Sequence, residues 1–114
     1  MSRHDDSVKV RHMLDAAKEA VDFLKDRGRE VLHSHRMLLL SLVRCLEVIG
    51  EAASKMSKEF QQKHPEIPWP LMIAVRNRMI HAYYDVDSDR VWEMVKSDLP
   101  PLILQLEKIL SNKD

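Results

Sequence analysis

The stretch MLLLSLVRCLEVIGEAASKM, residues 37–56, decides how the rest of the chain must be arranged. Its apolar residues form two helical stripes: Leu38, Leu42, Cys45, Ile49, Ala52 and Met56 on one, and Leu39, Val43, Leu46, Gly50 and Ala53 on the other. A helix that is apolar on two sides must be covered on two sides. We therefore expect one helix from about Glu30 to Met56 at the centre of the fold or at a subunit interface. Gly50 would let a neighbouring helix approach this one closely.

The chain before this stretch predicts a helix with a single apolar face. Residues 10, 14, 17, 21 and 24 are apolar and recur at spacings of four and three. Asp6 or Ser7 is placed to cap the start of this helix, and the run Arg27-Gly28-Arg29 ends it. Directly after the central helix, residues 57–60 predict a short helical turn.

The C-terminal half predicts two further long helices. The first runs from about Trp69 to His81 and has a proline in its first turn. The second begins at a cap provided by Asp87 or Ser88, and Pro100-Pro101 interrupts it. Because two prolines remove two backbone donors, we expect a kink there. The expected fold is all-α: a single domain over residues 1–114, built as an up-and-down bundle of four long helices plus a short one.

Composition and charge exclude several classes of protein. The chain has 114 residues, enough for one domain, and its 18 Lys and Arg residues balance its 18 Asp and Glu residues. Bulk charge therefore gives no attraction to nucleic acid, and any RNA contact would be local. The single cysteine, Cys45, excludes an internal disulfide and a thiolate metal cluster. The longest apolar run, residues 37–40, is too short to cross a membrane, so we expect a cytoplasmic protein.

Polar residues gather at the end of the third long helix, in VRNRMIHAYY, residues 75–84. Asn77 and His81 lie one turn and about 40° apart on a helix, so the amide can hydrogen-bond the imidazole and fix its tautomer. Arg76 lies about 140° from His81 around an ideal helix, so the two converge only near the helix end or if the arginine folds back. Tyr83 follows where the helix is expected to give way to a loop.

These residue types suit phosphodiester cleavage by a ribose 2′-hydroxyl without a metal ion. An imidazole at the C-terminal end of a helix gains proton affinity from the helix dipole, so it can accept and release protons near neutral pH. A guanidinium group offers a planar fork that matches phosphate oxygens. Any helix that ends in Arg and His would show this spacing, so the spacing alone favours a solvated or capping pair of side chains.

The segment Arg76-Asn77-Arg78-Met79-Ile80-His81-Ala82-Tyr83 resembles the R-x4-H-x-Y motif of the HepT-like toxins, which belong to the HEPN superfamily of all-helical RNases. Four other segments resemble this family in order and spacing: Arg11-His12-Met13-Leu14, Leu46-Glu47-Val48-Ile49-Gly50-Glu51-Ala52, His64-Pro65-Glu66-Ile67-Pro68-Trp69, and Val91-Trp92 followed by Asp98-Leu99-Pro100-Pro101-Leu102. The resemblance covers the chain from about residue 8 to residue 110.

The resemblance implies a metal-independent RNA endonuclease, the toxin of a type II toxin–antitoxin system. In that family two copies of the motif face each other across a two-fold axis and form a composite RNA cleft in a homodimer. By the same resemblance Arg76 would stabilise the phosphate, His81 would be the general acid or base, and Asn77 would orient the site. Arg78 could share the phosphate role. No metal and no cofactor is expected.

The resemblance also implies a protein partner. Family members are typically paired with an MNT-type nucleotidyltransferase antitoxin, which transfers AMP to the tyrosine of the motif. Tyr83 is the matching position, and Tyr84 is a second phenol that could be modified instead. A different class of function stays open: a non-catalytic helical subunit that binds a nucleotidyltransferase and presents Tyr83. A third interpretation is a bundle whose polar residues merely end a helix.

Two carboxylates of the central helix are further candidates. Glu47 and Glu51 lie one turn apart, and if this helix lies at an interface, one of them could pair with Arg76 or Arg78 or tune His81.

Five other side chains are better explained by structure than by function. His33 and His35 would point about 160° apart on a helix, which argues against a shared metal ion. Cys45 lies on an apolar stripe and is expected to be a buried, inert thiol. Trp69 and Trp92 could stack on bases, but both adjoin helix starts and apolar neighbours, which favours core packing.

Overall fold

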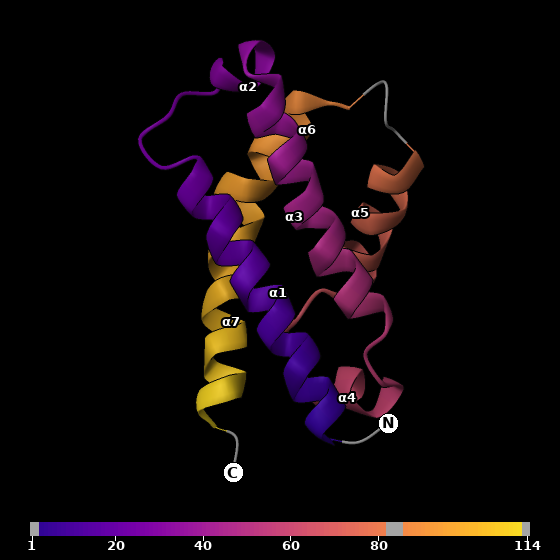
Figure 1. The fold of residues 1–114 in the computed structure, drawn as a ribbon. Helices are drawn as coiled ribbons and strands as arrows, with labels where there is room; N and C mark the ends of the chain where they lie inside the picture. The colour runs from indigo at the N-terminus through magenta and orange to yellow at the C-terminus, as the bar shows by residue number, and fades with distance from the viewer. Residues whose placement is uncertain (1–2, 82–85, 113–114) are drawn as a thin grey trace.

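The described part of the chain contains four long helices, as predicted. The computed structural model describes residues 3–81 and 86–112, and the side chains of residues 5–77 and 86–112. The long helices are α1 (Arg3–Phe23), α3 (Arg36–Ser54), α5 (Trp69–His81) and α7 (Leu99–Ser111) (Figure 1). Three short helices, where we expected one, join them: α2 (Val31–Ser34), α4 (Lys58–Lys63) and α6 (Ser88–Glu93), the last followed by a π-helical segment, η1 (Met94–Asp98). None of the helices within the described ranges is long and apolar enough to cross a lipid bilayer.

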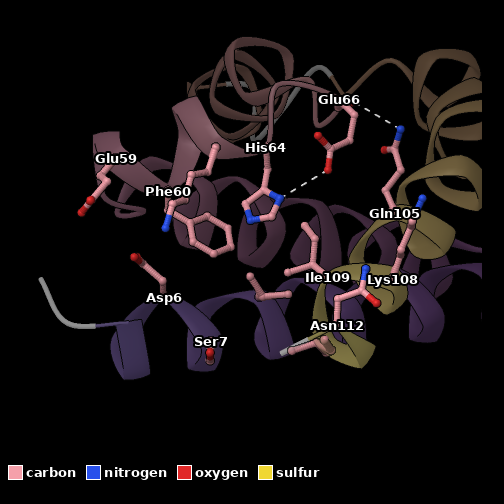
Figure 2. A pocket seen from close by; sticks show the side chains of 13 residues that line it. Asp6, Ser7, Glu59, Phe60, His64, Glu66, Gln105, Lys108, Ile109 and Asn112 are labelled. Atoms are coloured by element: carbon pink, nitrogen blue, oxygen red, sulfur yellow. Dashed lines mark hydrogen bonds and ion pairs between the residues drawn. The ribbon is translucent and has the colours of Figure 1, made fainter. Parts of the chain in front are cut away.

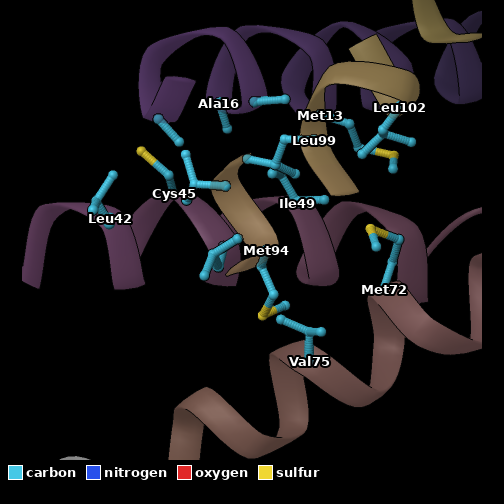
Figure 3. Packing of buried hydrophobic residues seen from close by; sticks show 14 of the residues in the cluster. Met13, Ala16, Leu42, Cys45, Ile49, Met72, Val75, Met94, Leu99 and Leu102 are labelled. Atoms are coloured by element: carbon cyan, nitrogen blue, oxygen red, sulfur yellow. The ribbon is translucent and has the colours of Figure 1, made fainter. Parts of the chain in front are cut away.

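The two apolar stripes of α3 are covered on two sides, which confirms the expectation of a central helix. α3 packs against α1 on one side and against α5 on the other, and α7 packs against α1 (Figure 1). The core between these helices brings together side chains of α1, α3, α5, η1 and α7 (Figure 3). Its fully buried members include Met13, Leu42, Ile49, Leu99 and Leu102.

Gly50 marks the place where α3 and α5 approach most tightly. A Cβ atom built on Gly50 would overlap Cβ of Arg76, and it would lie 2.8 Å from the carbonyl oxygen of Met72 and 2.9 Å from Cα of Arg76. Two of these three atoms belong to the α5 backbone, which cannot move aside as a flexible side chain can. The predicted role of Gly50, to admit a close neighbour, is confirmed.

The helix expected from Glu30 to Met56 is broken at His35, so that prediction is wrong at its N-terminal end. His35 has φ −118° and ψ 83°, which are not helical values. Its ring Nδ1 accepts a hydrogen bond of 3.2 Å from the backbone N–H of Leu38. The imidazole therefore caps α3, a role that serine or aspartate usually fills. The break leaves α2 as a separate helix of four residues.

The start of α1 also differs from the prediction. The helix already begins at Arg3, so neither Asp6 nor Ser7 caps it. Asp6 is instead buried, and its carboxylate accepts hydrogen bonds from the backbone N–H of Ser57 at 3.2 Å and from its hydroxyl at 2.8 Å. The hydroxyl of Ser57 in turn accepts from the backbone N–H of Phe60 at the start of α4. The apolar periodicity could not show this, because the first turn of α1 is anchored by a residue 51 positions away.

The last helix is interrupted, but by a π-helical turn in front of the two prolines. The cap at Asp87 is confirmed, since its side chain accepts from the backbone N–H of Arg90 at 3.1 Å. In η1 the N–H of Leu99 bonds to the carbonyl of Met94, five residues back. Pro100-Pro101 therefore falls in the first turn of α7, where missing N–H donors cost little. The interruption expected at the prolines is thus seen as a wider π-helical turn directly in front of them.

Replacing Gly50 by alanine is expected to destabilise the protein. Overpacking at a well-packed contact costs about 1–3 kcal/mol, and the better helix propensity of alanine offsets up to about 1 kcal/mol of this. Unfolding in urea, followed by circular dichroism, measures the change.

Gly28→Ala is the matched control for this substitution. Its new Cβ would meet only the far end of the Glu30 side chain, 2.9 Å away, and Gly28 has no positive φ. We expect its free energy of unfolding to stay within about 0.5 kcal/mol of the original value. A Gly50→Ala protein as stable as the original would contradict the close approach of α3 and α5.

Candidate functional site

Arg76 leaves α5 beside Gly50 and reaches along α3. The Nε of its guanidinium group donates to Oε1 of Glu51 at 3.0 Å, and its Nη2 forms an ion pair with the same oxygen at 2.9 Å. Its Nη1 donates to Oδ1 of Asn77 at 2.9 Å. The two hydrogen bonds engage two of the five N–H donors that a guanidinium group carries. The side chain of Arg76 is 32% exposed, so the group is held in place and still faces solvent.

Glu51 bridges two cations. Its Oε1 accepts from Arg76, while its Oε2 lies 3.0 Å from Nζ of Lys55, the residue that caps the C-terminal end of α3. The hydrogen bond from Lys55 and the positive charge of Arg76 lower the pKa of Glu51 below its usual range. At neutral pH the three side chains carry two positive charges and one negative charge, so the cluster stays cationic.

The hypothesis that one of the two carboxylates of α3 pairs with Arg76 is confirmed for Glu51. Glu47 lies one turn earlier and pairs instead with Arg44, at 3.7 Å. The two carboxylates lie one turn apart on α3, and of the two Glu51 is the one that contacts Arg76.

The structure brings together two of the predicted motif residues, Arg76 and Asn77. Helix α5 ends at His81, as predicted, but the side chains of Arg78 and His81 lie outside the described residues. Tyr83 and Tyr84 lie outside them as well. The amide oxygen of Asn77 accepts from Arg76. The expected contact between Asn77 and His81 stays a prediction, because the side chain of His81 lies outside the described residues.

Comparison with known proteins identifies the family of this chain. The family model described as "Ribonuclease HepT-like" matches residues 13–109, which include Gly50, Glu51 and the whole motif segment. The chain belongs to the HepT-like ribonuclease family. The predicted family is thereby confirmed.

Two relatives of this HepT-like chain illustrate the match. "Putative RNase MJ1380" from Methanocaldococcus jannaschii is 32% identical over 107 residues, which cover 94% of this chain and 98% of the relative. "Probable ribonuclease HepT" from Thermococcus cleftensis is 35% identical over 100 residues, which cover 84% of this chain and 91% of the relative. No solved structure matches the chain significantly.

The two histidines near α2 have structural partners. Nδ1 of His33 lies 3.3 Å from the hydroxyl of Ser88, and Nε2 lies 3.6 Å from Oδ1 of Asp89. His35 caps α3. The ring of His33 thus links α2 to α6, and the ring of His35 caps the start of α3. Within the described ranges, no three His, Cys, Asp or Glu side chains are grouped so as to hold a metal ion.

The two tryptophans differ in environment. Trp69 is buried, and its indole N–H donates to the carbonyl of His64 at 2.9 Å, which confirms core packing. Trp92 packs only partly against the core of this HepT-like chain, and two cations lie near its ring. Cζ of Arg29 is 5.8 Å and Nζ of Lys96 is 5.0 Å from the ring centroid. Cation–π attraction therefore adds to the packing of Trp92.

A cavity of about 930 Å³, which the motif analysis did not predict, opens at the opposite end of α5 from His81, between α1, α4 and α7 (Figure 2). Phe60 and His64 lie on its α4 side, with ring centroids 4.4 Å apart, and Ile109 of α7 faces them. Nδ1 of His64 lies 3.4 Å from a carboxylate oxygen of Glu66. Neither Arg76 nor Asn77 lines this cavity, so it is separate from the described part of the motif site.

Cys45 is buried, as predicted, and its thiol donates to Oε1 of Glu19 at 3.7 Å. Burial, followed by the charge of Glu19, raises the pKa of this thiol to about 11. The thiolate is the nucleophilic form of cysteine, so this thiol is unsuited to nucleophilic chemistry.

The high pKa of Cys45 predicts a slow reaction with a disulfide reagent. Only about one thiol in a thousand is ionised at pH 8 when the pKa is about 11. We expect Ellman's reagent to label the folded protein at pH 8 at least about 100-fold more slowly than the same protein in 6 M guanidinium chloride. Equal labelling rates in the two conditions would contradict the burial of the thiol.

Proposed function

We propose that this protein is a metal-independent RNA endonuclease that acts as the toxin of a toxin–antitoxin pair. Membership of the HepT-like ribonuclease family supports the class of reaction. The observation that carries the proposal is the guanidinium group of Arg76, which Glu51 and Asn77 hold at the surface five positions before His81.

The proposed reaction uses the RNA's own 2′-hydroxyl as the nucleophile. His81, as general base, takes the proton of this hydroxyl, and the resulting oxygen attacks the adjacent phosphorus atom. The bond to the 5′ oxygen breaks, and that oxygen leaves with a proton from a general acid. Arg76 stabilises the negative charge of the crowded phosphorane. The products are a cyclic phosphate end and a 5′-hydroxyl end.

The site is proposed to be complete only in a homodimer. One chain of this size supplies a single His81, whereas the reaction needs both a base and an acid. Two motif segments that face each other across a two-fold axis would supply one imidazole each. Isologous pairing of this kind is the commonest symmetry of homo-oligomers.

The proposed partner is an MNT-type nucleotidyltransferase antitoxin, and its proposed target is Tyr83. Transfer of AMP from ATP forms a bond between the phenol oxygen and the α-phosphorus atom and releases pyrophosphate. The added anion would lie beside Arg76 and His81 in the chain and would compete with the RNA phosphate.

The purified protein is expected to cut RNA in the presence of EDTA and to leave cyclic phosphate ends. Both Arg76→Ala and His81→Ala should lower the rate at least about 1,000-fold, because each removes a group that acts on the reacting atoms. Denaturing gels and end analysis by mass spectrometry provide the readout. Circular dichroism confirms that the variants are folded.

Two outcomes would contradict the nuclease proposal. One is cleavage that depends on added Mg²⁺ and stops in EDTA. The other is full activity of the His81→Ala protein. Activity restored by mixing the two inactive variants would instead support a shared site, because mixed dimers combine residues of both chains.

Incubation with an MNT-type nucleotidyltransferase and ATP is expected to add one AMP group to the chain. Intact-mass measurement detects the adduct, and peptide mapping places it at Tyr83. The matched variants Tyr83→Phe and Tyr84→Phe separate the two phenols: the first should abolish the adduct and the second should keep it. An adduct on a protein that never cuts RNA would favour the non-catalytic binding subunit instead.

A further inference from the structure

We infer that Glu51 is a positioning residue for Arg76. Lys55, on the other oxygen of Glu51, gives the cluster of these three side chains a net positive charge. The inference rests on the proposed function and names a residue of the same site. Neither Glu51 nor Lys55 belongs to the R-x4-H-x-Y motif: Glu51 lies on α3 and Lys55 is its C-cap, whereas the motif begins on α5.

Consecutive residues of α3 hold both ends of the Arg76 side chain. At the near end, Gly50 lies against Cα and Cβ of Arg76 and fixes where the side chain begins. At the far end, Oε1 of Glu51 accepts a hydrogen bond from Nε and forms an ion pair with Nη2, which together fix where the guanidinium plane lies. An arginine side chain with so many rotatable bonds would otherwise sample many positions. Because Gly50 and Glu51 are neighbours in one rigid helix, the two anchors cannot move independently.

The pairing of Arg76 with Glu51 alone would weaken the attraction to a phosphate. A one-to-one arginine–carboxylate pair is neutral overall, and the carboxylate repels an approaching anion. Lys55 lies on the other oxygen of Glu51, 3.0 Å away, and its side chain is 64% exposed. Lys9 of α1 donates to the backbone carbonyl of Lys55 at 2.8 Å, which places a further ammonium group nearby. The held guanidinium group therefore stays in a cationic environment.

A competing interpretation gives the opposite prediction. If Glu51 were only a counter-ion that RNA must displace from Arg76, then removing its charge would increase the affinity for RNA and raise the activity. The geometry favours positioning, because the hydrogen bond and the ion pair to Oε1 leave donors on Nη1 and Nη2 for a phosphate. A phosphate can thus bind Arg76 without displacing Glu51.

The test compares Glu51→Ala, Glu51→Gln and the matched control Glu47→Gln on the full-length chain. Glu47 lies on the same helix one turn away and contacts Arg44. With an RNA oligonucleotide as substrate, we expect Glu51→Ala to lower kcat by about 100-fold while KM changes much less, because misplacement of a catalytic group by about 1 Å costs that much. Glu51→Gln keeps an oxygen that accepts from Arg76, so it should retain more activity than Glu51→Ala. Glu47→Gln should match the original protein.

The position of Arg76 is measured independently of activity by NMR. The Nε–H signal of Arg76 should be sharp and slowly exchanging in the original protein, because the hydrogen bond to Glu51 protects it. Assignment uses the Arg76→Lys variant, which lacks this signal. The signal should broaden or vanish in Glu51→Ala and persist in Glu47→Gln.

The two readouts separate failure of the inference from failure of the proposed function. Activity in Glu51→Gln or Glu51→Ala at or above that of the original protein would overturn positioning, as would an unchanged Arg76 signal in Glu51→Ala. A loss of kcat in Glu47→Gln as large as that in Glu51→Ala would overturn the positioning role of Glu51 too. If the original protein cuts no RNA at all, the nuclease proposal fails, whereas the Arg76 signal still decides whether Glu51 holds the guanidinium group.

Discussion

Where α3 meets α5, the missing side chain at Gly50 lets the backbone of Arg76 lie directly against the central helix. The rest of the site depends on this contact. With a Cβ atom at residue 50, α5 would have to move outward, and the carboxylate of Glu51 could no longer reach both Nε and Nη2 of Arg76. One glycine thus links the packing of the bundle to the placement of its candidate catalytic cation.

The layout of the fold could be predicted because apolar periodicity reports which side of a helix is covered. The two stripes of residues 37–56 predicted a helix with neighbours on two faces, and α1 and α5 are those neighbours. The exact ends could not be predicted, because they depend on partners distant in sequence or on unusual caps. His35 caps α3 with its imidazole, and Asp6 bonds to Ser57 instead of capping its own helix.

The site was predictable in its residue types and less so in its contacts. Spacing along α5 singled out Arg76 and Asn77, and the hypothesis that a carboxylate of α3 reaches the motif holds for Glu51. Spacing could not show that Asn77 turns its oxygen to Arg76, because residues adjacent in sequence do not normally face each other on a helix. Arg76 makes this contact while its guanidinium group is also bound to Glu51 of α3. Such a contact depends on tertiary packing, which a helical projection of α5 alone does not contain.

The charge of the whole chain and the charge of the site point to the same kind of RNA recognition. The chain carries no net charge at neutral pH, so long-range attraction could not supply most of the affinity for RNA that the proposed function requires. The cluster of Lys55, Glu51 and Arg76 carries an excess positive charge at one place, where a phosphate would bind. In the proposed homodimer two such clusters would act on one strand, which doubles the local charge without making either free chain basic. Affinity for RNA would then depend on assembly, because a single chain offers only half of the charge and half of the site.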